Sequence, residues 1–108
     1  MKVKFSNGVV KDCTSPTEQK IFRPIDGITT AVGWLLILRI TGEVTSKELD
    51  NLLTTENIKT LEFLSENGNG EEISLFTLEG YEKITSSTIR HAEDTNDTSA
   101  EIQLTRGI

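Results

Sequence analysis

The chain has 108 residues, of which 35% are hydrophobic and 26% are charged, and its formal net charge at pH 7 is -6. This length and composition favour a single domain, residues 1–108, with one hydrophobic core, and they argue against full disorder. The acidic excess argues against sequence-independent binding of nucleic acid, which needs a dense field of Lys and Arg to displace counterions.

The first predicted element is a β-hairpin over residues 2–13. Residues 2–5 alternate polar and apolar side chains, and residues 9–13 form a second β-rich run. Between them, Asn7 and Gly8 are residue types that tolerate the positive φ angles of a two-residue turn. We therefore expect an antiparallel pair of strands at the start of the chain.

Residues 14–30 are predicted to form a long loop, with one turn beginning at Pro16. Regular periodicity fades here, and Pro16, Pro24 and Gly27 would each interrupt a helix or a central strand. Loops of this length inside a small domain are often functional or mobile.

The next segment, residues 33–41, is predicted to be the central strand. It is apolar on both faces for several residues, as expected of a strand that is covered on both sides, and Gly42 ends it. Because Trp34 leads this apolar run, we expect its indole to be buried in the core or at an interface.

A short helix is predicted at about residues 46–54. Thr45 can cap its first turn, and Glu48 can reach back to the N–H of the cap, which makes a capping box. One face of the helix then carries three leucines at the i, i+3, i+4 spacing: Leu49, Leu52 and Leu53.

Residues 60–64 fit either a helix or a strand, and the sequence that follows favours a strand. Residues 67–70, Asn-Gly-Asn-Gly, are a strong hairpin signal, and residues 72–78 resume β-rich alternation beyond it. A hairpin needs a strand on both sides of its turn, so 60–64 is predicted as the first of the two.

The last two predicted strands are residues 81–91 and 100–105, joined by an exposed polar connection at 93–99. The complete set of six to seven strands and one short helix indicates an α+β, mainly β fold. We expect an antiparallel β-sandwich or partly closed barrel, with the helix covering one opening.

The single cysteine, Cys13, excludes an intramolecular disulfide and is expected to be a packed thiol in a reducing cytoplasm. The N-terminal residues lack the apolar core of a signal peptide. The longest apolar run, residues 32–40, is far shorter than the roughly 20 residues that span a bilayer. We therefore expect no membrane partner.

No catalytic, cofactor or metal site is predicted. His91, the only histidine, has Glu93, Asp94 and Asp97 nearby in sequence. A zinc site needs three or four converging ligands, however, and His91 has neither a second histidine nor more than one thiol to join it. A structural or solvent-facing role for His91 is the favoured interpretation, and we expect the protein not to be an enzyme.

The candidate interaction surface consists of Trp34, Tyr81, Ile84 and Ile89. Trp34 and Tyr81 are aromatic side chains that can serve recognition. The hydroxyl-rich, β-branched residues 84–89 suggest an exposed strand edge that can pair with a neighbouring subunit by strand addition. An ordinary edge strand is the simpler explanation of that segment.

The early hairpin, the capped helix and the closing segments 80–84 and 99–105 form a pattern that resembles small β-rich virion proteins of bacteriophages or prophages, especially tail-associated ones. The resemblance covers the chain from Trp34 onward and transfers no functional residue. It implies a β-sandwich subunit that self-associates or docks to other subunits, with residues 14–30 ordering on assembly. The expected location is the cytoplasm, or the virion if the protein is phage-encoded.

These observations favour a non-enzymatic structural or assembly protein with protein partners or self-association into a homo-oligomer. The alternative is a small binding module in which a barrel mouth, or the sheet face around Trp34 and Tyr81, accepts a peptide, glycan or small molecule. A third hypothesis, a hydrolase or isomerase that uses His91 with a nearby carboxylate, is disfavoured because a lone histidine rarely makes a site.

Overall fold

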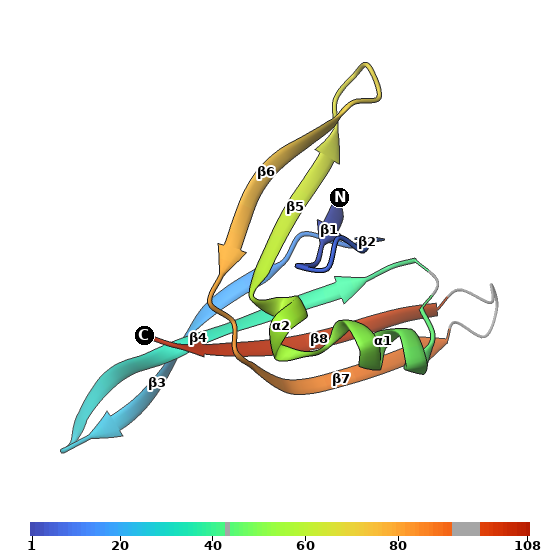
Figure 1. The fold of residues 1–108 in the computed structure, drawn as a ribbon. Helices are drawn as coiled ribbons and strands as arrows, with labels where there is room; N and C mark the ends of the chain where they lie inside the picture. Colours follow the sequence, from blue (N-terminus) through green and yellow to red (C-terminus); the bar gives the residue numbers. More distant parts are fainter. Residues whose placement is uncertain (43, 92–97) are drawn as a thin grey trace.

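The computed structural model of the protein describes residues 1–42, 44–91 and 98–108, which form eight strands and two helices (Figure 1). Sheet A, in the order β2-β1-β5-β6, contains β1 (Lys2–Lys4), β2 (Val10–Asp12), β5 (Thr60–Glu66) and β6 (Glu72–Glu79). Sheet B, in the order β3-β4-β8-β7, contains β3 (Thr17–Ile25), β4 (Ile28–Ile40), β7 (Lys83–His91) and β8 (Thr98–Gly107). Helices α1 (Ser46–Leu52) and α2 (Thr55–Ile58) connect β4 to β5.

The predicted mainly β, sandwich-like fold is confirmed, but the barrel alternative and the strand count are wrong. The described residues form two four-stranded antiparallel sheets that do not close into a barrel. The additional strand is β3, which lies in the segment predicted as a loop. A second short helix, α2, was also not expected from the sequence.

The long loop predicted for residues 14–30 is the main error. Instead, β3 and the first part of β4 form a hairpin in which Ile25 pairs with Ile28. The two turn residues, Asp26 and Gly27, have φ angles of 51° and 80°, as the tight turns of β-hairpins require. Proline has no backbone N–H to donate. β3 tolerates Pro24 because it is an edge strand, and no strand on its solvent side needs that hydrogen bond.

Both predicted hairpins with Asn-Gly turns are confirmed. β1 pairs with β2 from Lys2 opposite Asp12 to Lys4 opposite Val10. β5 and β6 pair across the second turn, where Glu66 lies opposite Glu72. The two closing strands are also confirmed, as β7 and β8, which pair with each other. Of the connection expected at 93–99, residues 93–97 lie outside the described residues, and residues 98 and 99 belong to β8.

The helix predicted at 46–54 is confirmed as α1. The hydroxyl of Thr45 accepts a hydrogen bond from the backbone N–H of Glu48 at 3.1 Å, as expected of the cap. Thr54 caps α2 in the same way, because its hydroxyl accepts from the N–H of Asn57 at 3.3 Å. The two helices bury Leu49, Leu52 and Ile58 against the core.

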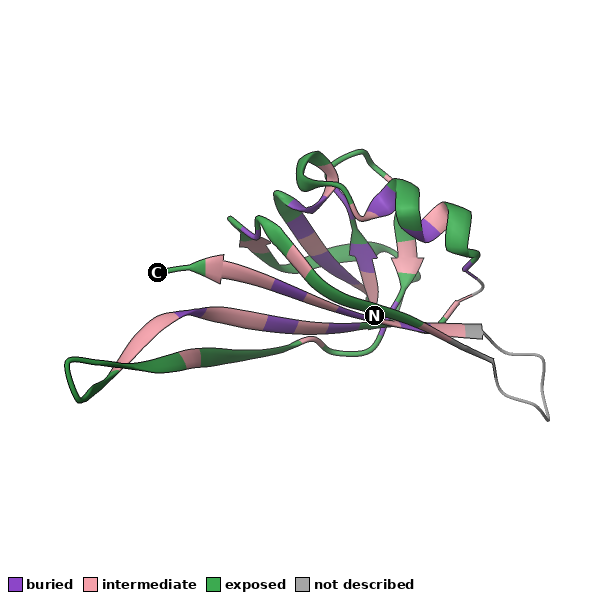
Figure 2. Cartoon of the chain, turned by 90° about the horizontal axis from the view of Figure 1, so that it is seen from below, coloured by how far each residue is buried: buried purple, intermediate pink, exposed green. Residues whose placement is uncertain are grey.

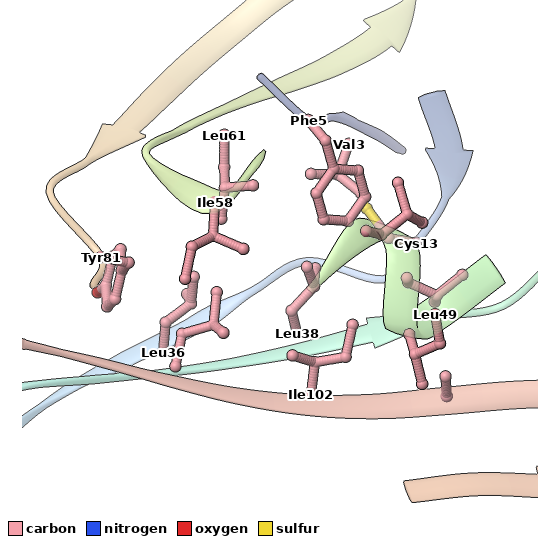
Figure 3. Close-up of a cluster of buried hydrophobic side chains, with 14 of the residues drawn as sticks. Val3, Phe5, Cys13, Leu36, Leu38, Leu49, Ile58, Leu61, Tyr81 and Ile102 are labelled. Atoms are coloured by element: carbon pink, nitrogen blue, oxygen red, sulfur yellow. The ribbon is translucent and has the colours of Figure 1, made fainter. Parts of the chain in front are cut away.

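The hydrophobic core lies between the two sheets and under the helices (Figure 3). β4 contributes alternate residues, Leu36, Leu38 and Ile40, all fully buried. Leu35 and Ile37, on its other face, are partly exposed, so this strand is fully covered on one side and not on both. The remaining core side chains come from most of the other elements: Val3, Phe5, Cys13, Leu61, Phe63, Ala100, Ile102 and Leu104.

The β3–β4 hairpin projects beyond the rest of sheet B. Pairing between β4 and β8 ends at Gly33 opposite Gly107, so residues 28–32 of β4 pair only with β3. We call residues 22–32 the arm; Figures 1 and 2 show it extending away from the core. Correspondingly, the radius of gyration is 15.4 Å, against about 13 Å for a compact domain of this length.

The base of the arm provides a matched pair of glycine variants. A Cβ added to Gly33 would lie 2.5 Å from the carbonyl oxygen of Arg106, whereas one added to its partner Gly107 would meet no atom within 4 Å. We expect Gly33→Ala to lower the free energy of unfolding by about 1–3 kcal/mol, because β4 must shift from β8. Gly107→Ala should be nearly neutral. Denaturant unfolding monitored by circular dichroism tests this, and equal stabilities of the two variants would contradict it.

Candidate functional site

The structure brings Trp34 and Tyr81 together at the base of the arm, where the faces of both rings contact the same arginine, Arg106. The guanidinium carbon of Arg106 lies 5.7 Å from the centroid of Trp34 and 5.3 Å from that of Tyr81. The ammonium of Lys20 lies 5.5 Å from the centroid of the same indole. These distances are within the range of cation–π attraction.

A carboxylate completes this group of side chains. The hydroxyl of Tyr81 donates a hydrogen bond of 2.5 Å to Oε2 of Glu18, and Nη2 of Arg106 lies 3.9 Å from the same oxygen. Nε of Arg106 is buried and has no hydrogen-bond partner among the described residues. We call Glu18, Lys20, Trp34, Tyr81 and Arg106 the Arg106 cluster.

The Arg106 cluster ties together four parts of the chain at the point where the arm leaves the core. Glu18 and Lys20 lie on β3, Trp34 lies on β4, and Arg106 lies on β8. Tyr81 comes from the connection between the two sheets and is fully buried at the margin of the core (Figure 3). Cations of the chain itself therefore lie against both rings, of which Tyr81 is fully buried and Trp34 is partly buried.

Burial determines the protonation of Tyr81. Desolvation of the phenol, together with its hydrogen bond to Glu18, raises its pKa to about 12, against an opposing effect of Arg106. The hydroxyl therefore remains a neutral donor throughout the ordinary pH range.

Ile84 and Ile89, the other two residues of the predicted surface, lie on β7. Both are partly buried and pack against the core. β7 is the edge of sheet B, as the strand-addition hypothesis requires. The exposed side chains between the two isoleucines are hydroxyls, from residues 85–88.

Sequence reasoning missed the most exposed apolar side chains of the arm. Phe22 is 56% exposed, Ile25 is 50% exposed and Ile28 is 69% exposed. Figure 2 shows the end of the arm in the colour of exposed residues. They surround the Asp26-Gly27 turn, which brings Ile25 and Ile28 opposite each other. The signal that could have found them is this Asp-Gly pair between two β-rich runs.

A second group of exposed apolar residues lies on β6. Ile73 is 45% exposed, Leu75 49% and Phe76 40%. Phe76 pairs with Phe63, and Ile73 pairs with Ser65, so both occupy the core-facing side of sheet A. Phe76 stacks on the buried ring of Phe63 at 4.8 Å. Figure 1 shows that β5 and β6 rise away from sheet B.

Two chemical candidates from the sequence are His91 and Cys13. His91 is the last residue of β7, and its possible acidic partners Glu93, Asp94 and Asp97 lie outside the described residues. Cys13 is buried as expected, and desolvation raises the pKa of its thiol to about 11. Over the described ranges, no three His, Cys, Asp or Glu side chains are grouped to hold a metal ion. Neither helix described here is long and apolar enough to cross a membrane.

A hollow of about 380 Å³ lies beside the base of the arm, on sheet B. Three cationic side chains and one carboxylate line it, together with Ile21 and Val32 of the β3–β4 hairpin: Arg23, Lys83, Arg106 and Glu82. Exposed apolar groups and positive charge therefore occur together around the arm.

Comparison with known proteins identifies no relative: no family model, no curated protein and no solved structure matches the chain.

Tyr81 is the only tyrosine, so the ultraviolet absorbance of tyrosinate reports on this hydroxyl alone. We expect the folded protein to titrate with a pKa of about 12, and the unfolded protein near the ordinary value of 10.0. Because the folded-state pKa is raised, stability should be fully present below about pH 10 and should fall as the pH rises toward 12. Glu18→Gln should lower the midpoint, because it removes the neighbouring negative charge. A folded-state midpoint at the ordinary value would contradict the buried contact.

Proposed function

We propose that the protein is a non-enzymatic structural or assembly subunit that works through protein–protein contacts made by the arm. The observation that carries this proposal is the projection of a two-stranded ribbon with exposed apolar side chains, Phe22, Ile25 and Ile28, beyond the core. Exposed apolar groups that gather on one feature mark interaction sites more often than scattered ones do.

Energetic considerations support a partner for the arm. A two-stranded hairpin is at best marginally stable by itself in water, because neither face is covered. Full burial of one large aliphatic or aromatic side chain contributes about 1.5–3 kcal/mol. Three such side chains on one hairpin can therefore contribute much of the free energy of a specific contact, provided that the arm is already held in place.

The Arg106 cluster supplies that support. It joins β3, β4 and β8 through one arginine, one carboxylate and two rings at the base of the arm. A preorganised arm loses less conformational entropy on binding than a loop that must first become ordered. This favours a docking element of fixed shape.

The proposed setting is a bacteriophage or prophage particle, in which the chain is a virion component, and specifically a tail-associated subunit, by its resemblance to such proteins. Support for this setting comes from the sequence pattern and from the combination of a β-sandwich with a projecting hairpin. Outside a particle, the proposal places the protein in the cytoplasm, with other protein subunits or further copies of itself as partners.

The binding-module alternative receives less support. It requires an open surface at Trp34 and Tyr81, but Tyr81 is fully buried and both rings already contact cations of the chain. A peptide, glycan or small molecule would have to displace these contacts before stacking on either ring.

The arm can be tested with a pair of conservative substitutions, Ile25→Thr and Ile28→Thr, combined in one variant. Threonine retains the β-branched shape that strands favour but removes exposed apolar surface. We expect the wild-type protein, in an extract of cells that naturally make it, to migrate in a complex larger than one chain. The affinity of the double variant should be at least about a hundredfold lower, since the burial of two side chains at about 1.5 kcal/mol each is lost.

Val10→Thr is the matched control, because Val10 is an exposed apolar residue on β2, away from the arm. It should leave the complex unchanged. Native gel filtration of the three proteins, followed by antibody detection, provides the measurement. A wild-type protein that migrates as a single chain, or a double variant that retains the complex, would contradict the proposed function.

A further inference from the structure

The two edge strands with exposed apolar side chains have opposite charge. The segment that forms the β5–β6 hairpin, residues 60–79, contains five glutamates and no lysine or arginine. β3 carries Lys20 and Arg23. The only carboxylate of β3, Glu18, is already bound to Tyr81. Five of the 17 acidic residues of the chain thus lie in the β5–β6 hairpin, and none of its 11 basic residues does.

Contacts within the chain neutralise only part of these charges. Lys2 lies 3.7 Å from Glu66 and 3.3 Å from Glu72. Glu71 and Glu79 have no ion-pair partner within the described ranges, and the same holds there for the cations of β3, Lys20 and Arg23. Both edges therefore retain charge that a partner of the opposite sign can neutralise.

The two strands are also open for pairing. β6 is an edge of sheet A and β3 is an edge of sheet B, so each has one unpaired row of backbone N–H and C=O groups. Their lengths are similar, eight residues for β6 and nine for β3. Exposed apolar side chains accompany both edges: Ile73, Leu75 and Phe76 on β6, and Phe22 and Ile25 on β3.

From these observations we infer that the chain self-associates head to tail, with β6 of one copy adding to β3 of the next copy. This inference rests on the proposed function and identifies the partner of the arm as a second copy of the same chain. The contact joins sheet A of one copy to sheet B of the next as one continuous sheet. It brings the glutamates of β6 toward Lys20 and Arg23.

Charge disfavours the symmetric alternatives. Antiparallel pairing of β6 with itself would bring Glu72 and Glu79 of the two copies together, and pairing of β3 with itself would bring lysine and arginine together. The other two edge strands provide less surface for an apolar contact. β2 has only three residues, and β7 exposes hydroxyl side chains between its two isoleucines. Because β6 and β3 are different surfaces, their contact is heterologous and builds a ring or a filament.

Paired charge reversals test this inference with purified protein alone. The first variant carries Glu71→Lys and Glu79→Lys, and the second carries Lys20→Glu and Arg23→Glu. We expect the wild-type mass, measured by light scattering, to rise with protein concentration and to fall as salt screens the contact. Each variant alone should associate at least about tenfold more weakly, because its two edges have the same sign.

Mixing the two variants is the decisive measurement. The mixture restores opposite charges at every contact, so it should assemble at least as readily as the wild-type protein, in alternating order. The neutral variants Glu71→Gln with Glu79→Gln, and Lys20→Gln with Arg23→Gln, should weaken association less than the reversals do and should not recover on mixing. They also provide the test if a reversed variant does not fold, as judged by circular dichroism.

Two results would overturn the inference: a wild-type protein that is monomeric at every concentration and salt, or reversed variants that do not recover on mixing. Failure here is distinguishable from failure of the proposed function. A purified monomer that still enters an arm-dependent complex in cell extract would retain the assembly role and assign the arm to a different protein. Loss of both the extract complex and self-association would remove both.

Discussion

The pairing of β4 with β8 over only part of its length is the constraint on which the molecule depends. Residues 33–37 of β4 have β8 on one side and β3 on the other. Pairing with β8 continues to Ile40, and the inward side chains of this part of β4 form the centre of the core. Residues 28–32 continue past the end of β8 and have only β3 as a neighbour. One strand thus builds the stable body at one end and the projecting arm at the other, so a change at Gly33, where β8 pairing ends, affects both.

The Arg106 cluster lies at this boundary, and its interactions explain why the arm can have a fixed direction without a hydrophobic core of its own. Aromatic rings accept the guanidinium on their faces, and Glu18 accepts a hydrogen bond from Tyr81. Desolvation makes such interactions stronger than they are at the surface, while the partial exposure of Arg106 limits the cost of burying its charge. The polar groups therefore hold the arm where apolar packing ends.

Local sequence signals predicted most of the fold. The Asn-Gly turns, the Thr45 cap and the alternation in residues 100–105 depend on neighbouring residues, and each produced the expected element. The prediction for residues 14–30 failed because it depended on strand order, which is not a local property of the sequence. Pro24 argues against a central strand but is compatible with an edge strand. Asp26-Gly27 was a local hairpin signal that the prolines obscured. The contact of Glu18 with Tyr81 and Arg106 joins residues far apart in sequence, so no pattern in one segment could indicate it.

Exposed edge strands with apolar side chains are usually a hazard, because any other edge can pair with them. Natural proteins limit this hazard with charges, bulges and prolines at the edge, and this chain has all three: glutamates at both ends of β6, a bulge within it, and Pro24 with two cations on β3. Charges of one sign on each edge oppose pairing of an edge with its own copy. Because the charges on the two edges have opposite sign, pairing of β6 with β3 is the combination in which both the apolar and the electrostatic contributions are favourable. The same residues that protect the protein from indiscriminate aggregation therefore specify an ordered contact, and the direction of that contact follows from the placement of β6 and β3 on different sheets.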